Sequence, residues 1–136
     1  MAANPLFYDT PVKTGNDALA VLLNSGFLEL FTGSQPALNG AVSGTLLVTL
    51  TFSSTAFASS AASAGTVTAT ANSITSGTAV ATGTAGYFAL LKTDGTTVVA
   101  TGTVGTSSAD LILSSTSIGS GATVSCSGFT ITQPQT

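Results

Sequence analysis

The Asp94-Gly95 pair constrains the fold most strongly, because it lies between two β-prone runs within residues 79–104. Asp and Gly both tolerate positive φ, which a two-residue type I′ turn requires at both central positions. The pair therefore predicts a β-hairpin in which Leu91 faces Val98. The same register sets Thr93 opposite Thr96, Leu90 opposite Val99, and Phe88 opposite Thr101.

The first strand of this hairpin is apolar on both faces. Side chains alternate across a strand, so Phe88 and Leu90 share one face. The opposite face carries Tyr87, Ala89 and Leu91. The pattern predicts a central element that is covered on both sides, and we expect the Phe88 face to be the deeper one.

The rest of the chain alternates short β-prone runs with turns. The 136 residues include 25 Thr, which favours strands, and 18 Ser and 15 Gly, which favour turns. Further strands are expected at Phe27–Phe31, Leu46–Phe52, Thr66–Ile74, Asp110–Ser114 and Ala122–Thr132. Leu28 and Leu30 are expected on the core face of the first of these strands. In the third, Val67 and Ala69 alternate with Thr66, Thr68 and Thr70, and in the last a bulge is expected near Gly128. About seven or eight short strands with Gly/Ser turns indicate an all-β fold, a β-sandwich. A chain of strands that must cross between two sheets favours the jelly-roll-like variant.

One short helix interrupts this pattern near the N-terminus. Residues Asn16–Asn24 carry an apolar stripe at helical spacing, and Asp17 suits the positive end of a helix dipole. Thr14 or Asn16 can cap the helix, and Gly26 can terminate it. Two and a half turns are too few for an isolated helix, so tertiary packing must hold it.

The N-terminal residues 1–13 are expected to form an extended arm, because Pro5 and Pro11 push the residues before them towards extended conformations. Residues 14–136 are expected to form a single β-sandwich domain. The arm contains an apolar group that can pack on its own domain or reach a neighbouring molecule. The candidate partner contacts are Leu6, Phe7 and Tyr8 of the arm, together with Tyr87.

Charge is scarce, with 5% charged residues against about 25% in typical domains. Soluble domains normally carry mixed charges that resist association. A surface this bare is explained if copies of the chain or a partner cover much of it. Alternatively, hydroxyl groups keep the protein in solution. The seven charged residues are Asp9, Lys13, Asp17, Glu29, Lys92, Asp94 and Asp110.

The composition argues against several function classes. Two lysines and no Arg are too few to neutralise nucleic-acid phosphates. Without His, and with scattered acids, the chain lacks the usual groups of acid–base catalysis and of zinc sites. No catalytic residue, metal site or cofactor is therefore expected. Cys126 shares a face with Val124 in an alternating run and is expected to be a small buried hydrophobe.

The sequence is not expected to contain a signal peptide or a membrane-spanning segment. Met1–Thr10 lacks the basic start and apolar centre of a signal peptide. No apolar run approaches the 18 or more residues of a membrane span. The expectation is a protein made in the cytoplasm, without export and without a membrane partner.

A string of motifs across residues 27–132 resembles a family of tailed-phage capsid cement, or head decoration, proteins. They are Phe-Thr-Gly-Ser-Gln-Pro (31–36), Leu-Leu-Val-Thr-Leu-Thr-Phe-Ser-Ser-Thr-Ala-Phe (46–57), Ala-Thr-Gly-Thr-Ala-Gly-Tyr-Phe (81–88), Lys-Thr-Asp-Gly-Thr (92–96), Gly-Thr-Val-Gly-Thr-Ser-Ser-Ala-Asp-Leu (102–111) and the segments Gly-Ala-Thr-Val-Ser and Phe-Thr-Ile-Thr within 121–132. The arm is outside the match.

The resemblance implies a non-enzymatic virion protein of a bacteriophage with a jelly-roll-like fold. It implies a position on the capsid exterior, contacts with the phage major capsid protein and with copies of itself, and a stabilising role for the head. A tail, neck or fibre component of the same kind of particle is the alternative. A carbohydrate-binding adhesin is less favoured, because such proteins use aromatic platforms and the chain has no Trp and two Tyr.

Overall fold

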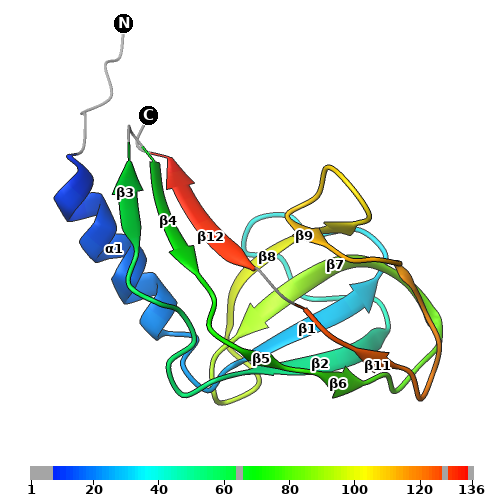
Figure 1. Cartoon of the computed structure of the whole chain (residues 1–136). Helices are drawn as coiled ribbons and strands as arrows, with labels where there is room; N and C mark the ends of the chain where they lie inside the picture. Colours follow the sequence, from blue (N-terminus) through cyan, green and yellow to red (C-terminus); the bar gives the residue numbers. More distant parts are fainter. Residues whose placement is uncertain (1–7, 64–65, 127–128, 135–136) are drawn as a thin grey trace, which may run out of the picture.

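The chain is seen in a computed structural model that describes residues 8–63, 66–126 and 129–134. Within these residues, one helix precedes a series of short strands (Figure 1). The elements are α1 (Asp9–Val21), β1 (Phe27–Thr32), β2 (Leu46–Phe52), β3 (Ala61–Ser63), β4 (Thr66–Thr70), β5 (Ile74–Thr75), β6 (Gly77–Thr78), β7 (Gly83–Leu91), β8 (Val98–Gly105), β9 (Leu111–Ile112), β10 (Ser117–Ile118), β11 (Thr123–Val124) and β12 (Thr130–Pro134). The expected class, all-β with one short helix, is confirmed.

The largest sheet has the order β5-β2-β1-β7-β8-β9, with β10 paired to the start of β7. All its neighbours are antiparallel except β8 and β9, which run parallel. The order sets β2, β1, β7 and β8 side by side in one curled sheet (Figure 1). Jelly-roll connectivity is not confirmed by this order.

A smaller sheet of order β12-β4-β3 lies beside the large one, and β6 pairs with β11. Figure 1 shows α1 running along β3 and β4. The expected alternation in β4 is confirmed, because Val67 and Ala69 are buried while Thr66, Thr68 and Thr70 are not. The helix thus covers the apolar side of the small sheet.

The main core fills the space between the large sheet, the small sheet and α1. It contains Leu28 and Leu30 of β1 and Phe88 and Leu90 of β7, as the alternation predicted. Three rings extend it: Phe57 packs between Phe52 and Phe129, and Phe129 meets Phe88 edge to face at 5.5 Å between ring centroids.

A second cluster covers the other face of β7. Tyr87, Ala89 and Leu91 are buried there with Phe31. The loop after β1 and the start of β2 close over this cluster through Val42 and Leu46. The prediction that β7 is covered on both sides is confirmed. The expectation that the Tyr87 face is the shallower one is wrong at Tyr87 itself, which is 0% exposed.

The hairpin turn differs from the predicted two-residue loop. Lys92 N–H donates to the Thr97 carbonyl (3.0 Å), so residues 93–96 form a four-residue loop. Gly95 has a φ of 73°, as predicted, but Asp94 is not among the residues with positive φ, so the turn is not type I′. Asp94 instead accepts hydrogen bonds from the N–H groups of Thr96 and Thr97 (2.8 Å each).

The predicted register of the hairpin is confirmed at the pair next to the loop and is wrong for the pairs farther from the loop. Leu91 faces Val98 as predicted, but Leu90 faces Ala100, which leaves Val99 without a partner. Phe88 consequently faces Gly102 and not Thr101. A β-bulge adds one residue to one strand, and turn chemistry alone does not reveal it.

The helix begins seven residues earlier than predicted and ends three residues earlier. Residues 9–13 belong to α1, so the described end of the expected arm is helical, and residues 1–7 lie outside the described part. Pro11 is accommodated because the first turn of a helix needs no N–H donors. Thr14 and Asn16, the predicted capping residues, lie within the helix and do not cap it, and Asp17 is not in its first turn. Gly26 follows the turn and packs so tightly that a Cβ would lie 2.2 Å from the Leu91 carbonyl oxygen.

The predicted C-terminal strand is divided in two. Residues 123–124 pair with β6, and residues 130–134 pair with β4, so the segment serves two sheets. The bulge expected near Gly128 lies outside the described residues. Val124 and Cys126 pack against the main core as expected, although Cys126 is half-buried, and its burial raises the pKa of the thiol.

We expect Gly95→Val to lower the free energy of unfolding by about 1–3 kcal/mol, because a β-branched residue is strained at positive φ. The glycine Cβ direction is open, with Phe27 at 3.8 Å, so the loss reports the backbone and not a clash. Urea unfolding measures it. Gly119→Val is the matched control, since Gly119 has open space and no positive φ. Equal stability of both variants would contradict the turn geometry.

We expect Tyr87→Ala and Phe88→Ala to destabilise the protein by similar amounts, about 3–5 kcal/mol each, because both faces of β7 are buried. Val80→Ala should change stability by less than about 0.5 kcal/mol, since Val80 is 69% exposed. Thermal and urea unfolding of the three variants compare them. A Tyr87→Ala loss close to that of Val80→Ala would show that the second cluster does not stabilise the fold.

Candidate interaction surface

The structure separates the four predicted partner contacts. Tyr8 immediately precedes α1 and is 80% exposed, so its ring is available to a partner. Leu6 and Phe7 lie outside the described residues. Tyr87, by contrast, is fully buried and cannot contact a partner, which corrects the prediction for this residue.

Tyr87 is buried because its ring and its hydroxyl both find partners inside the second cluster. The ring stacks on Phe31 with centroids 5.3 Å apart. The hydroxyl accepts a hydrogen bond from the Ser43 N–H (2.9 Å) and donates one to the Ser43 carbonyl. A buried tyrosine hydroxyl needs such partners, and here they tie the loop before β2 to β7.

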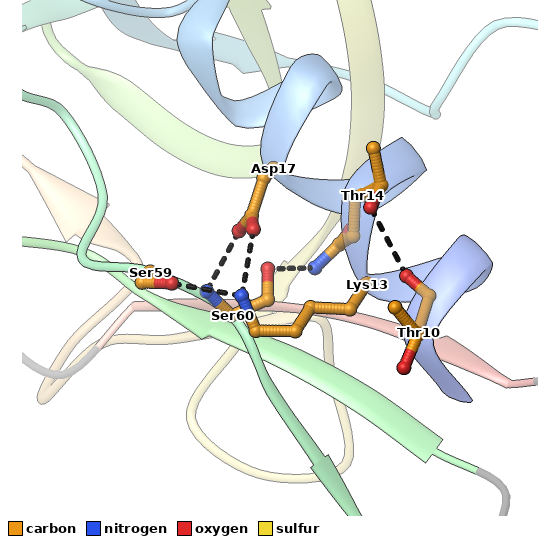
Figure 2. Close-up of polar contacts among 7 residues, drawn as sticks. Thr10, Lys13, Thr14, Asp17, Ser59 and Ser60 are labelled. Carbon is orange, nitrogen blue, oxygen red and sulfur yellow. Dashed lines mark hydrogen bonds and ion pairs between the residues drawn. The ribbon is translucent and has the colours of Figure 1, made fainter.

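Polar side chains of α1 fix the helix to the segment just before β3 (Figure 2). Lys13 Nζ lies 3.0 Å from Asp17 Oδ2 and 2.9 Å from Ser59 Oγ. Asp17 Oδ1 accepts a hydrogen bond from the Ser60 N–H at 2.7 Å. Hydrogen bonding from Ser60, joined by the Lys13 ammonium, lowers the pKa of Asp17 to about 2. These contacts orient the helix, and the charges of Lys13 and Asp17 are paired with each other.

Among the side chains of α1 whose burial the structure describes, Asn16 is the fully buried polar one. Its Nδ2 donates to Ser60 Oγ at 2.9 Å, while its Oδ1 has no hydrogen-bond partner within the described residues. The pair joins the same two segments as Asp17 and Ser60. Buried polar contacts of this kind favour one alignment of two elements over others.

Two further aspartates, Asp94 and Asp110, accept hydrogen bonds that stabilise the fold, whereas Glu29 is partly desolvated. Asp94 organises the β7–β8 loop, and hydrogen bonds from the Thr97 hydroxyl and then from the Thr97 and Thr96 N–H groups hold its pKa well below the usual range. Asp110 accepts a hydrogen bond from the Thr103 N–H at 3.0 Å. Glu29 is half-buried beside Thr49, and desolvation raises its pKa.

The described polar side chains form no recognisable catalytic or metal-binding group. Within the described residues, no three His, Cys, Asp or Glu side chains gather where they could hold a metal ion. Lys13 Nζ lies beside a serine hydroxyl, but the same ammonium is bonded to Asp17. The functional surface is therefore sought among exposed apolar and hydroxyl side chains.

The outer edge of β8 is the surface that sequence reasoning missed. Leu38, at the tip of the loop between β1 and β2, is 93% exposed, and Val98 of β8 is exposed at 40%. Both line a shallow hollow of about 300 Å³ formed by residues 36–40 and 98–101. The one signal for it in the sequence is Leu38 itself, a large apolar residue beside an Asn-Gly turn.

A second and larger hollow, of about 400 Å³, opens on the other side of the same part of β8. Its walls are α1, β7, residues 99–101 of β8 and residues 129–132. The apolar side chains of Leu19, Leu23 and Phe129 contribute to its lining. Residues 98–101 of β8 therefore lie between two hollows, which makes this edge the candidate interaction surface.

Comparisons with protein-family models, curated proteins and solved structures find no match to this chain. No helix in the described part of the chain is long and apolar enough to cross a membrane. The functional conclusion therefore depends on the surface itself and on the resemblance in the sequence.

The pKa values of Asp17 and Glu29 shift in opposite directions, so these two carboxyl groups predict opposite effects of pH. The pKa of Asp17 lies below its ordinary value of 3.8, so its stabilising contribution is complete above that value and is lost as the pH falls towards about 2. We expect Asp17→Asn to destabilise the protein at pH 7 and to do so less as the pH approaches 2. Thermal unfolding across pH measures the difference from the unsubstituted chain.

Glu29 provides the contrast. Its raised pKa means that the folded state loses stability as the pH rises past the ordinary value of 4.5, because the charged form is desolvated. Glu29→Gln should therefore raise the melting temperature at pH 7, and this gain should vanish below pH 4.5. Destabilisation by Glu29→Gln at pH 7 would contradict the burial argument.

Proposed function

We propose that the chain is a non-enzymatic structural protein of a bacteriophage virion, a capsid cement or decoration protein. In this role it binds the major capsid protein on the outside of the head and stabilises the shell. The observation that carries the proposal is the scarcity of charged residues, 5% of the chain, although the chain is long enough to form an ordinary soluble domain.

Four of the seven charged residues make contacts within the fold. Asp17, Asp94 and Asp110 accept hydrogen bonds from backbone N–H groups, and Lys13 is paired with Asp17. A surface rich in Thr, Ser, Ala and Gly loses little solvation energy when it is covered, because it carries few ions to desolvate. Such a surface suits close packing against a repeating shell.

On a shell that carries many copies of the protein, a small interface per copy is sufficient for stable binding. Each copy on a shell binds beside others, and shared contacts raise the effective concentration of the next one. Exposed apolar residues, among them Tyr8 and Leu38, are the anchors that such an interface needs. A jelly-roll-like connectivity belongs to this proposal through the resemblance, but the binding argument does not require it.

The same properties suit a tail, neck or fibre protein, so the position in the particle has to be tested. The carbohydrate-binding alternative is weaker, because it requires exposed aromatic platforms. Tyr87 is buried, and Tyr8 is the exposed tyrosine.

Binding to heads tests the proposal. Purified protein should co-sediment with tail-free heads that lack it, and it should stay bound at about 1 M NaCl, where the Debye length is about 3 Å and exposed charge pairs are screened. Heads already carrying the protein are the control for saturation. Failure to bind heads would contradict the cement role, and release by moderate salt would contradict an interface with little charge.

A further inference from the structure

The larger hollow is bounded by two strand edges. Residues 99–101 of β8 form one wall and residues 129–132 form another, while Leu19, Leu23, Phe88 and Leu90 lie between them. Its volume of about 400 Å³ falls within the range of clefts that bind ligands, about 300–1,000 Å³. We call it the β8–β12 groove.

The edge of β12 that faces away from β4 has no strand partner within the described residues. Ala71 N–H donates to the Phe129 carbonyl at 2.8 Å, so Phe129 points its backbone groups towards the β4 side. Backbone groups alternate along a strand, and Thr130 and Thr132 therefore direct their N–H and C=O groups outward. Unpaired edges of this kind are templates for another strand.

The edge of β8 is occupied only in part. β9 pairs with Val104 and Gly105, which leaves residues 98–103 beyond its reach. The outward carbonyl of Thr101 accepts a hydrogen bond from Gln35 Nε2 at 3.1 Å, and the outward N–H of Thr103 donates to Asp110. The β8 wall therefore requires fewer new hydrogen bonds than the β12 wall.

We propose that this groove receives residues 1–7 of a second copy of the chain as an added β-strand paired with β12. The inference deepens the proposed function and rests on it for the idea that copies share interfaces. Addition of an extended segment to an open edge is an established mode of recognition in proteins.

The sequence of the segment fits the groove. In an extended conformation one side carries Met1, Ala3, Pro5 and Phe7, all apolar, which suits the apolar residues between the two strand edges, while Asp110 and three threonines are the polar part of the lining. Ala2, Asn4 and Leu6 then share the opposite side. The backbone N–H and C=O groups of residues 1, 3, 5 and 7 point to one edge of the added strand, and those of residues 2, 4 and 6 point to the other. Pro5 lacks an N–H, so the first edge is placed towards β8, where the Thr101 carbonyl already has a partner. The second edge, which has all its N–H groups, is placed towards β12.

A second copy is favoured over the chain's own N-terminus by the direction of α1. Leu19 and Leu23 line the groove near the C-terminal end of the helix, whereas Tyr8 precedes its first residue. Eleven helical residues between Tyr8 and Leu19 separate them by about 16 Å. Figure 1 shows the first turn of α1 beside the end of the small sheet that points away from the large sheet. The chain would have to reverse at once to fill its own groove.

Light scattering of the full-length protein tests the donor segment. The unsubstituted chain should associate reversibly with concentration. Phe7→Asp should raise the dissociation constant by about thirtyfold or more, as expected for a buried aromatic anchor. Leu6→Asp is the matched control, with the same change one residue away on the other side of the strand, and it should have a much smaller effect. Monomeric full-length protein, or equal effects of both variants, would overturn the proposal.

The receiving edge has its own test. Thr132→Pro removes an outward N–H and should weaken association, while Thr132→Val keeps that N–H and should not. Circular dichroism checks that both variants fold. The Phe7→Asp variant keeps an intact groove, and the Thr132→Pro variant keeps an intact N-terminal segment. Association should therefore return when the two variants are mixed. Two variants that stay monomeric when mixed would overturn exchange between copies.

These measurements use free protein, so they are independent of head binding. A monomer that still coats heads would overturn the strand exchange and leave the cement role standing. A protein that associates with itself but does not bind heads would overturn the cement role and leave the strand exchange standing.

Discussion

The fold depends on the burial of β7 on both of its faces. β7 lies between β1 and β8 in the large sheet, with Phe88 and Leu90 in the main core and Tyr87 and Leu91 in the second cluster. A strand covered on both sides requires a layer on each, and the chain supplies them by different means. The small sheet with α1 closes one side, and the loop that ends at β2 closes the other.

The local pattern was sufficient for those parts of the fold that depend on neighbouring residues. Alternation placed Leu28 and Leu30 in the core, and Asp94-Gly95 located the hairpin. The sequence did not reveal the bulge at Val99, because the bulge depends on how the paired strands twist. The early start of α1 is not predicted, because Pro11 favours an extended conformation for the residue before it, whereas the first turn of a helix tolerates proline.

Contacts between distant segments account for the errors at the candidate site. Tyr87 is buried by a loop more than forty residues earlier in the chain, through Ser43, and no local pattern announces that contact. Asn16 is predicted to cap the helix and Asp17 to lie at its positive end, but both side chains are bonded to Ser60 instead. The exposed edge of β8 and the open edge of β12 become visible only when the register of each sheet is known. The scarcity of charge, in contrast, was evident from composition, and the structure shows that the described carboxyl groups mostly stabilise turns and the helix.

The central claim is that the charge-poor surface exists to be covered in an assembly. A cryo-EM map of purified phage particles in which this protein is detected tests it most directly. The account predicts density for the chain on the outer surface of the head, with Leu38 and the edge of β8 facing neighbouring subunits. Density in the tail, or copies on the head with these surfaces open to solvent, would contradict it.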